Sequence, residues 1–189
     1  CLTNTDCPAQ AFSWEAALLA EKLIEKEGVD VVEGQEWEAP LYYLQLRRAL
    51  GLGSRRTPPC LIHLHSPSEL IFRYNQWDLT LADFLPLARF EAYSVRAADA
   101  LVCPSRYLAK GAEGLFLLPR GSVEVIPYPL GDTPRLERSP EVWARNSICF
   151  VGRLELRKGI VEWVRAAVAV ADRRSGGSFD FIRADTSLN

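Results

Sequence analysis

Two positively charged residues and two glycines lie close together where an apolar run gives way to an amphipathic segment. The run 147–151 leads into Gly152 and Arg153, and Lys158 and Gly159 follow a few residues later. A glycine lets the backbone approach a phosphate, and the first turn of a helix supplies N–H donors and a partial positive charge. Arginine binds phosphate oxygens in bidentate fashion, and lysine adds a compact second charge. The spacing is that of a diphosphate site, although a polar loop with solvated charges has the same composition.

The only two histidines of the chain alternate along a second apolar run. His63 and His65 belong to the run 59–65, and side chains two positions apart on a strand point to the same face. His65 closes the run, and ligands of open α/β sheets bind at the carboxyl ends of strands. We expect His63 to lie deeper, in the core or behind His65. A metal pair is the alternative, but no third ligand has a suitable spacing, so no metal site is predicted.

Acidic and aromatic residues follow the ends of the expected strands. The stretch 33–38 contains Glu36 and Trp37. Its side chains either line a binding cleft or are acidic groups favoured near a helix N-terminus, and we prefer the second interpretation. The stretch 66–78, which includes Glu69, is rich in aromatic and polar groups. It is either a loop that binds an acceptor or a helix that covers the sheet, and both interpretations remain open.

Short apolar runs alternate with longer amphipathic segments, which is typical of a doubly wound α/β architecture. The runs are apolar almost throughout, as in parallel strands that are covered on both faces. Strands are expected at 29–33, 59–65, 100–103, 123–126 and 147–151, and helices at about 12–27, 38–50, 80–98, 106–117 and 158–174. The stretch 147–182 then forms one unit of strand, loop, helix and strand.

The composition argues against several classes of protein. The formal net charge is −2, which disfavours a protein that binds nucleic acid by neutralising its phosphates. No apolar run approaches the ~20 residues of a transmembrane segment, and the start lacks the pattern of a signal peptide. Cys60, Cys103 and Cys149 lie within apolar runs and are expected to be buried thiols. These features predict a cytoplasmic protein.

The domain organisation follows from a change in composition. The stretch 127–146 holds several prolines and charges with little periodicity, as a linker does. We predict a partial first domain at 1–130, a linker at 131–146 and the start of a second domain at 147–189. The 189 residues contain no Met, so we expect both ends to be cut. The second part is marginal for an independent core, and we expect another chain or a missing segment to cover it.

Several segments, taken in order, carry a resemblance to a known family. They are Phe-Val-Gly-Arg-Leu-Glu-Leu-Arg-Lys-Gly-Ile at 150–160, Ala-Ala-Asp-Ala-Leu-Val-Cys-Pro-Ser at 97–105, Val-Glu-Val-Ile-Pro at 123–127, and Glu91. Together they resemble the retaining group 1 (family 4) glycosyltransferases of the GT-B fold. The resemblance implies Rossmann-like parallel sheets, with most of the first domain and the opening βαβ unit of the second.

The resemblance also implies transfer of a sugar from a nucleotide diphosphosugar, without a separate cofactor, to an acceptor that is a sugar, a lipid or a small molecule. It makes His65 the catalytic candidate, since it would face the cleft between the domains. The residues that it implies for the donor diphosphate are Gly152, Arg153, Lys158 and Gly159. Those that it implies on the acceptor side are Glu36, Trp37 and Glu69.

The chain departs from the family pattern in three places. The Gly-rich loop of the first domain and the Glu-x7-Glu element of the second have no counterpart, so we expect a longer parent protein to be the enzyme and these residues alone to be inactive. Tyr128-Pro129 stands where the family usually has Asn-Gly, a change expected to alter only the entry to the linker. The alternatives are a non-catalytic binding or scaffolding module with this fold, or another GT-B enzyme such as a nucleotide-sugar epimerase.

Overall fold

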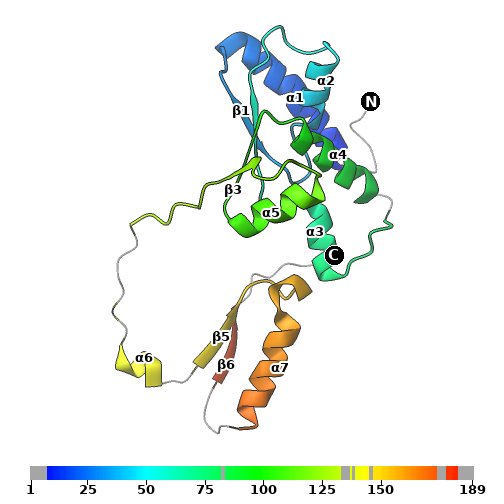
Figure 1. Cartoon of the computed structure of the whole chain (residues 1–189). Helices are drawn as coiled ribbons and strands as arrows, with labels where there is room; N and C mark the ends of the chain where they lie inside the picture. Colours follow the sequence, from blue (N-terminus) through cyan, green and yellow to red (C-terminus); the bar gives the residue numbers. More distant parts are fainter. Residues whose placement is uncertain are drawn as a thin grey trace. The chain divides into compact units, whose positions relative to one another are not determined.

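A computed structural model describes residues 8–81, 84–132, 137, 139–144, 147–173 and 178–182. The chain divides into two compact units. The first consists of Cys1–Arg73 with Asp78–Pro129, and the second of Tyr74–Trp77 with Leu130–Asn189. Each unit contains its own parallel sheet, and Figure 1 shows the elements of both.

The sheet of the first unit has four parallel strands in the order β1-β2-β3-β4. They are β1 (Val32–Gln35), β2 (Cys60–His63), β3 (Ala100–Cys103) and β4 (Val123–Val125). In register, Gly34 lies beside Ile62, Ile62 beside Leu101, and Leu101 beside Val123. The predicted parallel α/β class is confirmed, although the first strand begins at Val32 rather than at residue 29.

Helices lie against one face of this sheet. They are α1 (Pro8–Glu27), α2 (Tyr42–Ala49), α4 (Phe84–Arg96) and α5 (Arg106–Leu115), whereas α3 (Ser68–Asn75) follows β2 along the chain. Parallel strands laid down consecutively in one direction are joined by right-handed connections, which carry their helices to the same face. The core agrees with this rule, because residues of α1, α2, α4 and α5 form one buried cluster with Cys60, Ile62 and Leu64 of the chain through β2.

The opposite face of the sheet is more exposed. Glu33 in β1 is exposed, and Leu61 and His63 in β2 are half-buried, whereas Cys60 and Ile62 between them are buried. The prediction that the strands are covered on both faces is therefore wrong for β1 and β2 within the described residues. The physical reason is the strand order, because connections that all run in one direction leave the second face without a connecting helix.

Two helical segments differ from their predicted bounds for local reasons. Helix α2 begins at Tyr42 rather than at residue 38. Glu38 and Ala39 have positive φ angles of 59° and 46°, a left-handed conformation that a right-handed helix does not contain. The stretch 66–78 contains α3, so the helical interpretation is the correct one for most of its length.

The second unit contains the predicted strand, loop, helix and strand. Strands β5 (Ser147–Val151) and β6 (Ser178–Ile182) are parallel neighbours, and η1 (Leu156–Lys158) and α7 (Ile160–Ala171) lie between them in the chain. The ring of Trp163 lies 5.7 Å from that of Phe150 and 4.6 Å from that of Phe181. A short helix, α6 (Pro140–Ala144), lies within the stretch predicted to be a linker.

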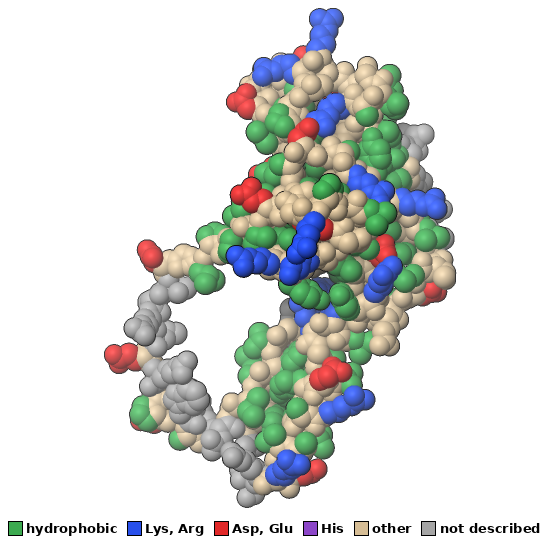
Figure 2. Space-filling view, in the orientation of Figure 1, with side chains coloured by type: hydrophobic (Ala, Val, Ile, Leu, Met, Phe, Trp, Pro, Cys, Tyr) green, Lys and Arg blue, Asp and Glu red, His purple; other side chains and the backbone are tan. Residues whose placement is uncertain are grey.

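Much of the apolar surface of the second unit is exposed. Val164 and Val168 of α7 are exposed, and hydrophobic side chains are visible over this part of the molecule in Figure 2. Cys60 and Cys103 are buried, as predicted, but Cys149 is exposed. That prediction is wrong because α7 packs on the face of β5 that carries Phe150, whereas neighbouring residues of a strand point to opposite faces. What covers this unit stays a prediction.

The three thiols should therefore react differently with a maleimide. We expect Cys149 to be modified at least about 10-fold faster than Cys60 or Cys103 in the folded protein, because a buried thiol must wait for local opening. Peptide mapping by mass spectrometry gives the rate at each residue. Equal rates in the folded chain would contradict the packing of β5, and Cys149→Ser is the matched control for assignment.

Candidate functional site

The carboxyl end of β2 carries His65 on a short braced segment. Leu64 continues the ladder by donating its N–H to the Val102 carbonyl oxygen at 2.7 Å. His65 follows with an exposed side chain, and its backbone N–H donates to Oε1 of Glu36 at 2.7 Å. Ser66 donates its N–H to the same oxygen. The position of the His65 backbone is thus fixed by a carboxylate from the loop after β1.

Glu36 is fully buried, with an exposed fraction of 0 %. Its second oxygen, Oε2, is buried without a hydrogen-bond partner in the described part of the chain. Burial raises the pKa of the Glu36 carboxyl, and the N–H groups of His65 and Ser66 oppose that rise. This interior position braces the loop after β2 and is not that of a side chain lying open to an acceptor, which was the role expected from the resemblance.

A second buried carboxylate, Glu91 of α4, holds the neighbouring segments. It accepts the Ser68 N–H at 2.9 Å and also the Ser68 hydroxyl, at the start of α3. It further accepts the N–H of left-handed Glu38 at 3.2 Å. Burial, with a smaller contribution from the charge of Glu36, raises the pKa of Glu91 to about 7. The two carboxylates therefore tie the loops after β1 and β2 to α4.

Three rings and a carboxylate form an exposed row beside these braces. Nδ1 of His65 is hydrogen-bonded to the hydroxyl oxygen of Tyr128, and the two rings are nearly parallel at 14° with centroids 6.0 Å apart. The ring of His63 stacks 6.2 Å from that of His65, and its Nε2 lies 2.9 Å from Oε1 of Glu33. His63 is half-buried and lies next to His65 rather than in the buried core, so of the two places expected for it the one beside His65 is observed. Tyr128 contacts His65, so the expectation that it alters only the entry to the linker is wrong.

The other two residues expected on the acceptor side lie in the loop after β1 and at the start of α3. Trp37 is half-buried in the loop after β1. Glu69 is on the first turn of α3 and forms an ion pair with Arg73 one turn later. Its carboxylate is therefore partly neutralised within its own helix. An acceptor role for Trp37 and Glu69 stays a prediction.

In the second unit, the loop between β5 and α7 holds three cations, two of which pair with one carboxylate. Nε of Arg153 lies 3.0 Å from Oε1 of Glu155, and Nε of Arg157 lies 2.6 Å from Oε2. Arg153 is exposed over 46 % of its side chain, whereas Arg157 is exposed over 15 %. Lys158 is exposed at the end of η1. With three cations and one carboxylate, the loop has an excess of positive charge.

Glycines shape both ends of this loop. Gly152 has a φ of 150° directly after β5, and Gly159 has a φ of 74° between η1 and α7. Both values lie in regions that side-chain-bearing residues rarely adopt. The left-handed Gly159 ends η1 and allows α7 to start at Ile160, with Lys158 just before the first turn.

Burial raises the pKa of the Glu155 carboxyl, but the hydrogen bonds that the carboxylate accepts, chiefly from Arg157, and the nearby positive charges together outweigh burial. The pKa of Glu155 therefore lies below its ordinary value.

The sequence of the first unit matches a known family. Residues 4–129, more than half of the chain, match the family described as Glycosyl transferase 4-like domain. The chain belongs to this family. The match of the glycosyl transferase 4-like domain ends at Pro129, as does the first unit. No curated protein matches the chain.

The matched domain contains the braced histidine but not the cationic loop. His65 and its partners lie within residues 4–129, whereas Arg153 and Lys158 come after the transferase 4-like match. Sequence reasoning missed the partner roles of Glu91 and Tyr128. Glu91 could have been recognised as a bracing residue, because it lies on a helix expected to cover the sheet and a buried acidic group needs hydrogen-bond partners. No signal along the chain pairs residue 128 with residue 65.

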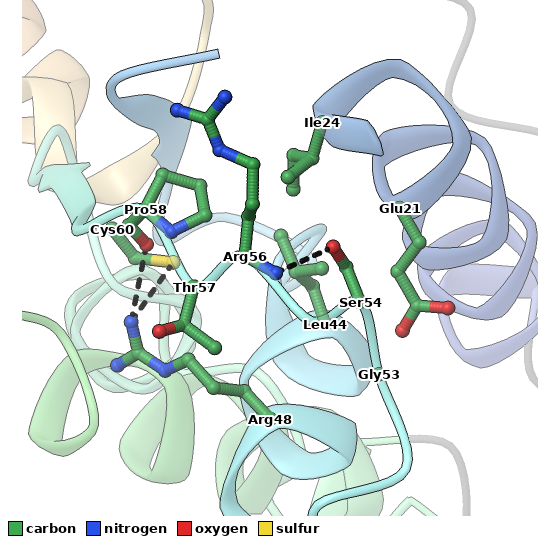
Figure 3. Close-up of a pocket in the computed structure, with 10 residues that line it drawn as sticks. All are labelled: Glu21, Ile24, Leu44, Arg48, Gly53, Ser54, Arg56, Thr57, Pro58 and Cys60. Atoms are coloured by element: carbon green, nitrogen blue, oxygen red, sulfur yellow. Dashed lines mark hydrogen bonds between the residues drawn. The ribbon is translucent and has the colours of Figure 1, made fainter. Parts of the chain in front are cut away.

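The transferase 4-like domain also has a small pocket at the amino end of β2 (Figure 3), lined in part by Cys60. Arg48 of α2 reaches the Pro58 carbonyl oxygen at 3.3 Å and pairs with Asp99 at 2.8 Å. Asp99 also accepts the Cys60 N–H at 2.7 Å. Burial raises the pKa of the Cys60 thiol, which disfavours the reactive thiolate. These contacts are structural and lie at the opposite end of the strand from His65.

Two further observations concern ligands and membranes. Among the residues that the structure describes, no group of three or more His, Cys, Asp and Glu side chains is placed to hold a metal ion. Within the same residues, no helix combines the length and the apolar character needed to cross a bilayer.

Proposed function

We propose that this glycosyl transferase 4-like chain takes part in the transfer of a sugar from a nucleotide diphosphosugar to an acceptor. The two units would be parts of the two domains of a GT-B enzyme, with the second unit on the donor side. The observation that carries the proposal is the cationic loop before α7, in a chain whose first unit belongs to a transferase family. Gly152 and Gly159 would let its backbone approach the phosphates.

Sugar transfer from a nucleotide diphosphosugar requires stabilisation of the leaving group. As the sugar gains oxocarbenium character, the nucleoside diphosphate departs with increasing negative charge, and fixed cations lower the energy of that state. Arg153 would bind diphosphate oxygens through the guanidinium nitrogens that Glu155 does not engage, and Lys158 would add a second charge. His65 would act at the reacting sugar, with retention of the anomeric configuration as the family resemblance implies.

Isothermal titration with UDP and GDP tests the donor site. We expect the chain to bind at least one of the two nucleotides, and we expect Arg153→Ala to weaken that binding by about 10- to 100-fold. This range corresponds to the roughly 1.5–3 kcal/mol of a charge-assisted hydrogen bond. A folded chain that binds neither nucleotide would contradict the proposal.

Arg165 supplies the matched control, since it is an exposed arginine on α7. Arg165→Ala should leave nucleotide affinity unchanged within about 2-fold, as expected for a charge outside the binding loop. If both alanine variants weaken binding equally, the effect is general attraction between the basic surface and the nucleotide. Incubation with nucleotide sugars but no acceptor distinguishes an epimerase, which would form an isomerised nucleotide sugar.

A further inference from the structure

We propose that Tyr128 is a positioning residue for His65, which holds the imidazole in one orientation and one tautomer. The proposal rests on the function proposed above, because it concerns the histidine that would act at the reacting sugar. It adds a residue from the end of the first unit to the site. Tyr128 lies just beyond β4, after Ile126 has extended the ladder by donating its N–H to the Cys103 carbonyl oxygen at 2.9 Å.

One hydrogen bond joins the side chains. The hydroxyl of Tyr128 is hydrogen-bonded to Nδ1 of His65, and the two rings are nearly parallel, with 14° between their planes and their centroids 6.0 Å apart. The hydrogen bond restrains rotation of the imidazole about its side-chain bonds. The ring of His63, 28° from that of His65, continues the row.

The backbone of His65 is held separately. Its N–H is bonded to buried Glu36, so the backbone stays in place whether or not Tyr128 is present. The freedom that remains to His65 is rotation about its two side-chain bonds. Tyr128 removes that freedom, and a reacting group held in advance loses less entropy when the substrate binds.

The partner of Nδ1 also decides which nitrogen carries the proton. A phenol hydroxyl donates well, and the unprotonated nitrogen of a neutral imidazole accepts. With the Tyr128 hydroxyl as donor, Nδ1 is the acceptor and the proton of neutral His65 resides on Nε2. His65 then presents an N–H group that can donate to a hydroxyl oxygen of the sugar.

The side chains of Tyr128 and His65 are both exposed, and this determines how removal of the hydroxyl affects stability. Tyr128 is 57 % exposed and His65 is also exposed, so their bond competes with water. An exposed hydrogen bond contributes little to folding. Loss of the hydroxyl should therefore change the state of His65 without changing the stability of the fold.

The test is nitrogen NMR of the 189-residue chain labelled with 15N in its histidine rings, at about pH 8, where an imidazole of ordinary pKa is neutral. The chain has only two histidines, and His63→Asn assigns the two sets of signals. We expect wild-type His65 to show a single tautomer with the proton on Nε2. Tyr128→Phe keeps the ring but removes the donor, and we expect loss of that single-tautomer pattern with unchanged thermal unfolding.

Tyr107→Phe, on exposed Tyr107 of α5, is the matched control and should leave the His65 signals unchanged. A wild-type His65 protonated on Nδ1, or the same tautomer ratio in wild type and Tyr128→Phe, would overturn the proposal. UDP titration separates it from the donor-site proposal. A chain that does not bind UDP or GDP counts against the donor site alone, because the tautomer of His65 is measured without nucleotide.

Discussion

Replacing Glu36 with alanine is expected to lower the free energy of unfolding by about 2–5 kcal/mol, the largest effect of any single substitution considered for the first unit. The variant removes the acceptor for the N–H groups of His65 and Ser66. A buried donor left without a partner costs about 1–3 kcal/mol, and two part-buried donors are affected here. Urea denaturation at constant pH measures the change.

Two further variants make this expectation specific. Glu36→Gln keeps a carbonyl oxygen that can accept the two N–H groups, so it should recover more than half of the loss. Glu124→Ala changes an exposed glutamate of the same sheet and should stay within about 0.5 kcal/mol of wild type. If Glu36→Ala is as stable as Glu124→Ala, the carboxylate does not brace the loop after β2.

The protein is expected to lose about 1–3 kcal/mol of stability between about pH 4.5 and pH 7 through Glu91. The pKa of Glu91 is raised to about 7 in the folded chain, chiefly by burial. Within this window the folded state keeps a proton that the unfolded state has released. The stabilisation is therefore fully present below the ordinary pKa and is lost as pH rises through the folded value. Urea denaturation at several pH values measures the slope.

Glu91→Gln removes the titrating group while keeping a side chain of similar shape. Its stability should vary less with pH across the same window, by about 1–3 kcal/mol. Glu124→Gln is the control and should keep the wild-type slope, because Glu124 is exposed. Identical slopes for wild type and Glu91→Gln would show that the carboxyl titrates normally in the folded protein.

The sequence determined those features that depend on neighbours along the chain. The runs around Ile62, Leu101 and Val123 are apolar because they belong to parallel strands that pack into one buried core, and this pattern was sufficient to predict the class of fold. The pairs Gly152-Arg153 and Lys158-Gly159 could also be recognised from neighbouring residues along the chain. A strand, a left-handed glycine and a helix are local structures, so the position of the loop could be predicted from its composition.

The tertiary structure alone decided which side chains meet. Glu36 and Glu91 are separated by more than fifty residues, yet both brace the segment from His65 to Ser68 because β1, β2 and α4 are neighbours in the folded unit. Tyr128 meets His65 because β2 and β4 are parallel strands whose carboxyl ends lie at the same end of the sheet.

The exposed face of β1 and β2 and the exposure of Cys149 were likewise invisible along the chain. Composition states how apolar a strand is, but the order of strands and the placement of helices decide which of its faces is covered. The sequence thus determined the elements and the kind of chemistry that they could support. The packing of those elements decided that His65 is held by a buried carboxylate at its backbone and by a tyrosine at its ring.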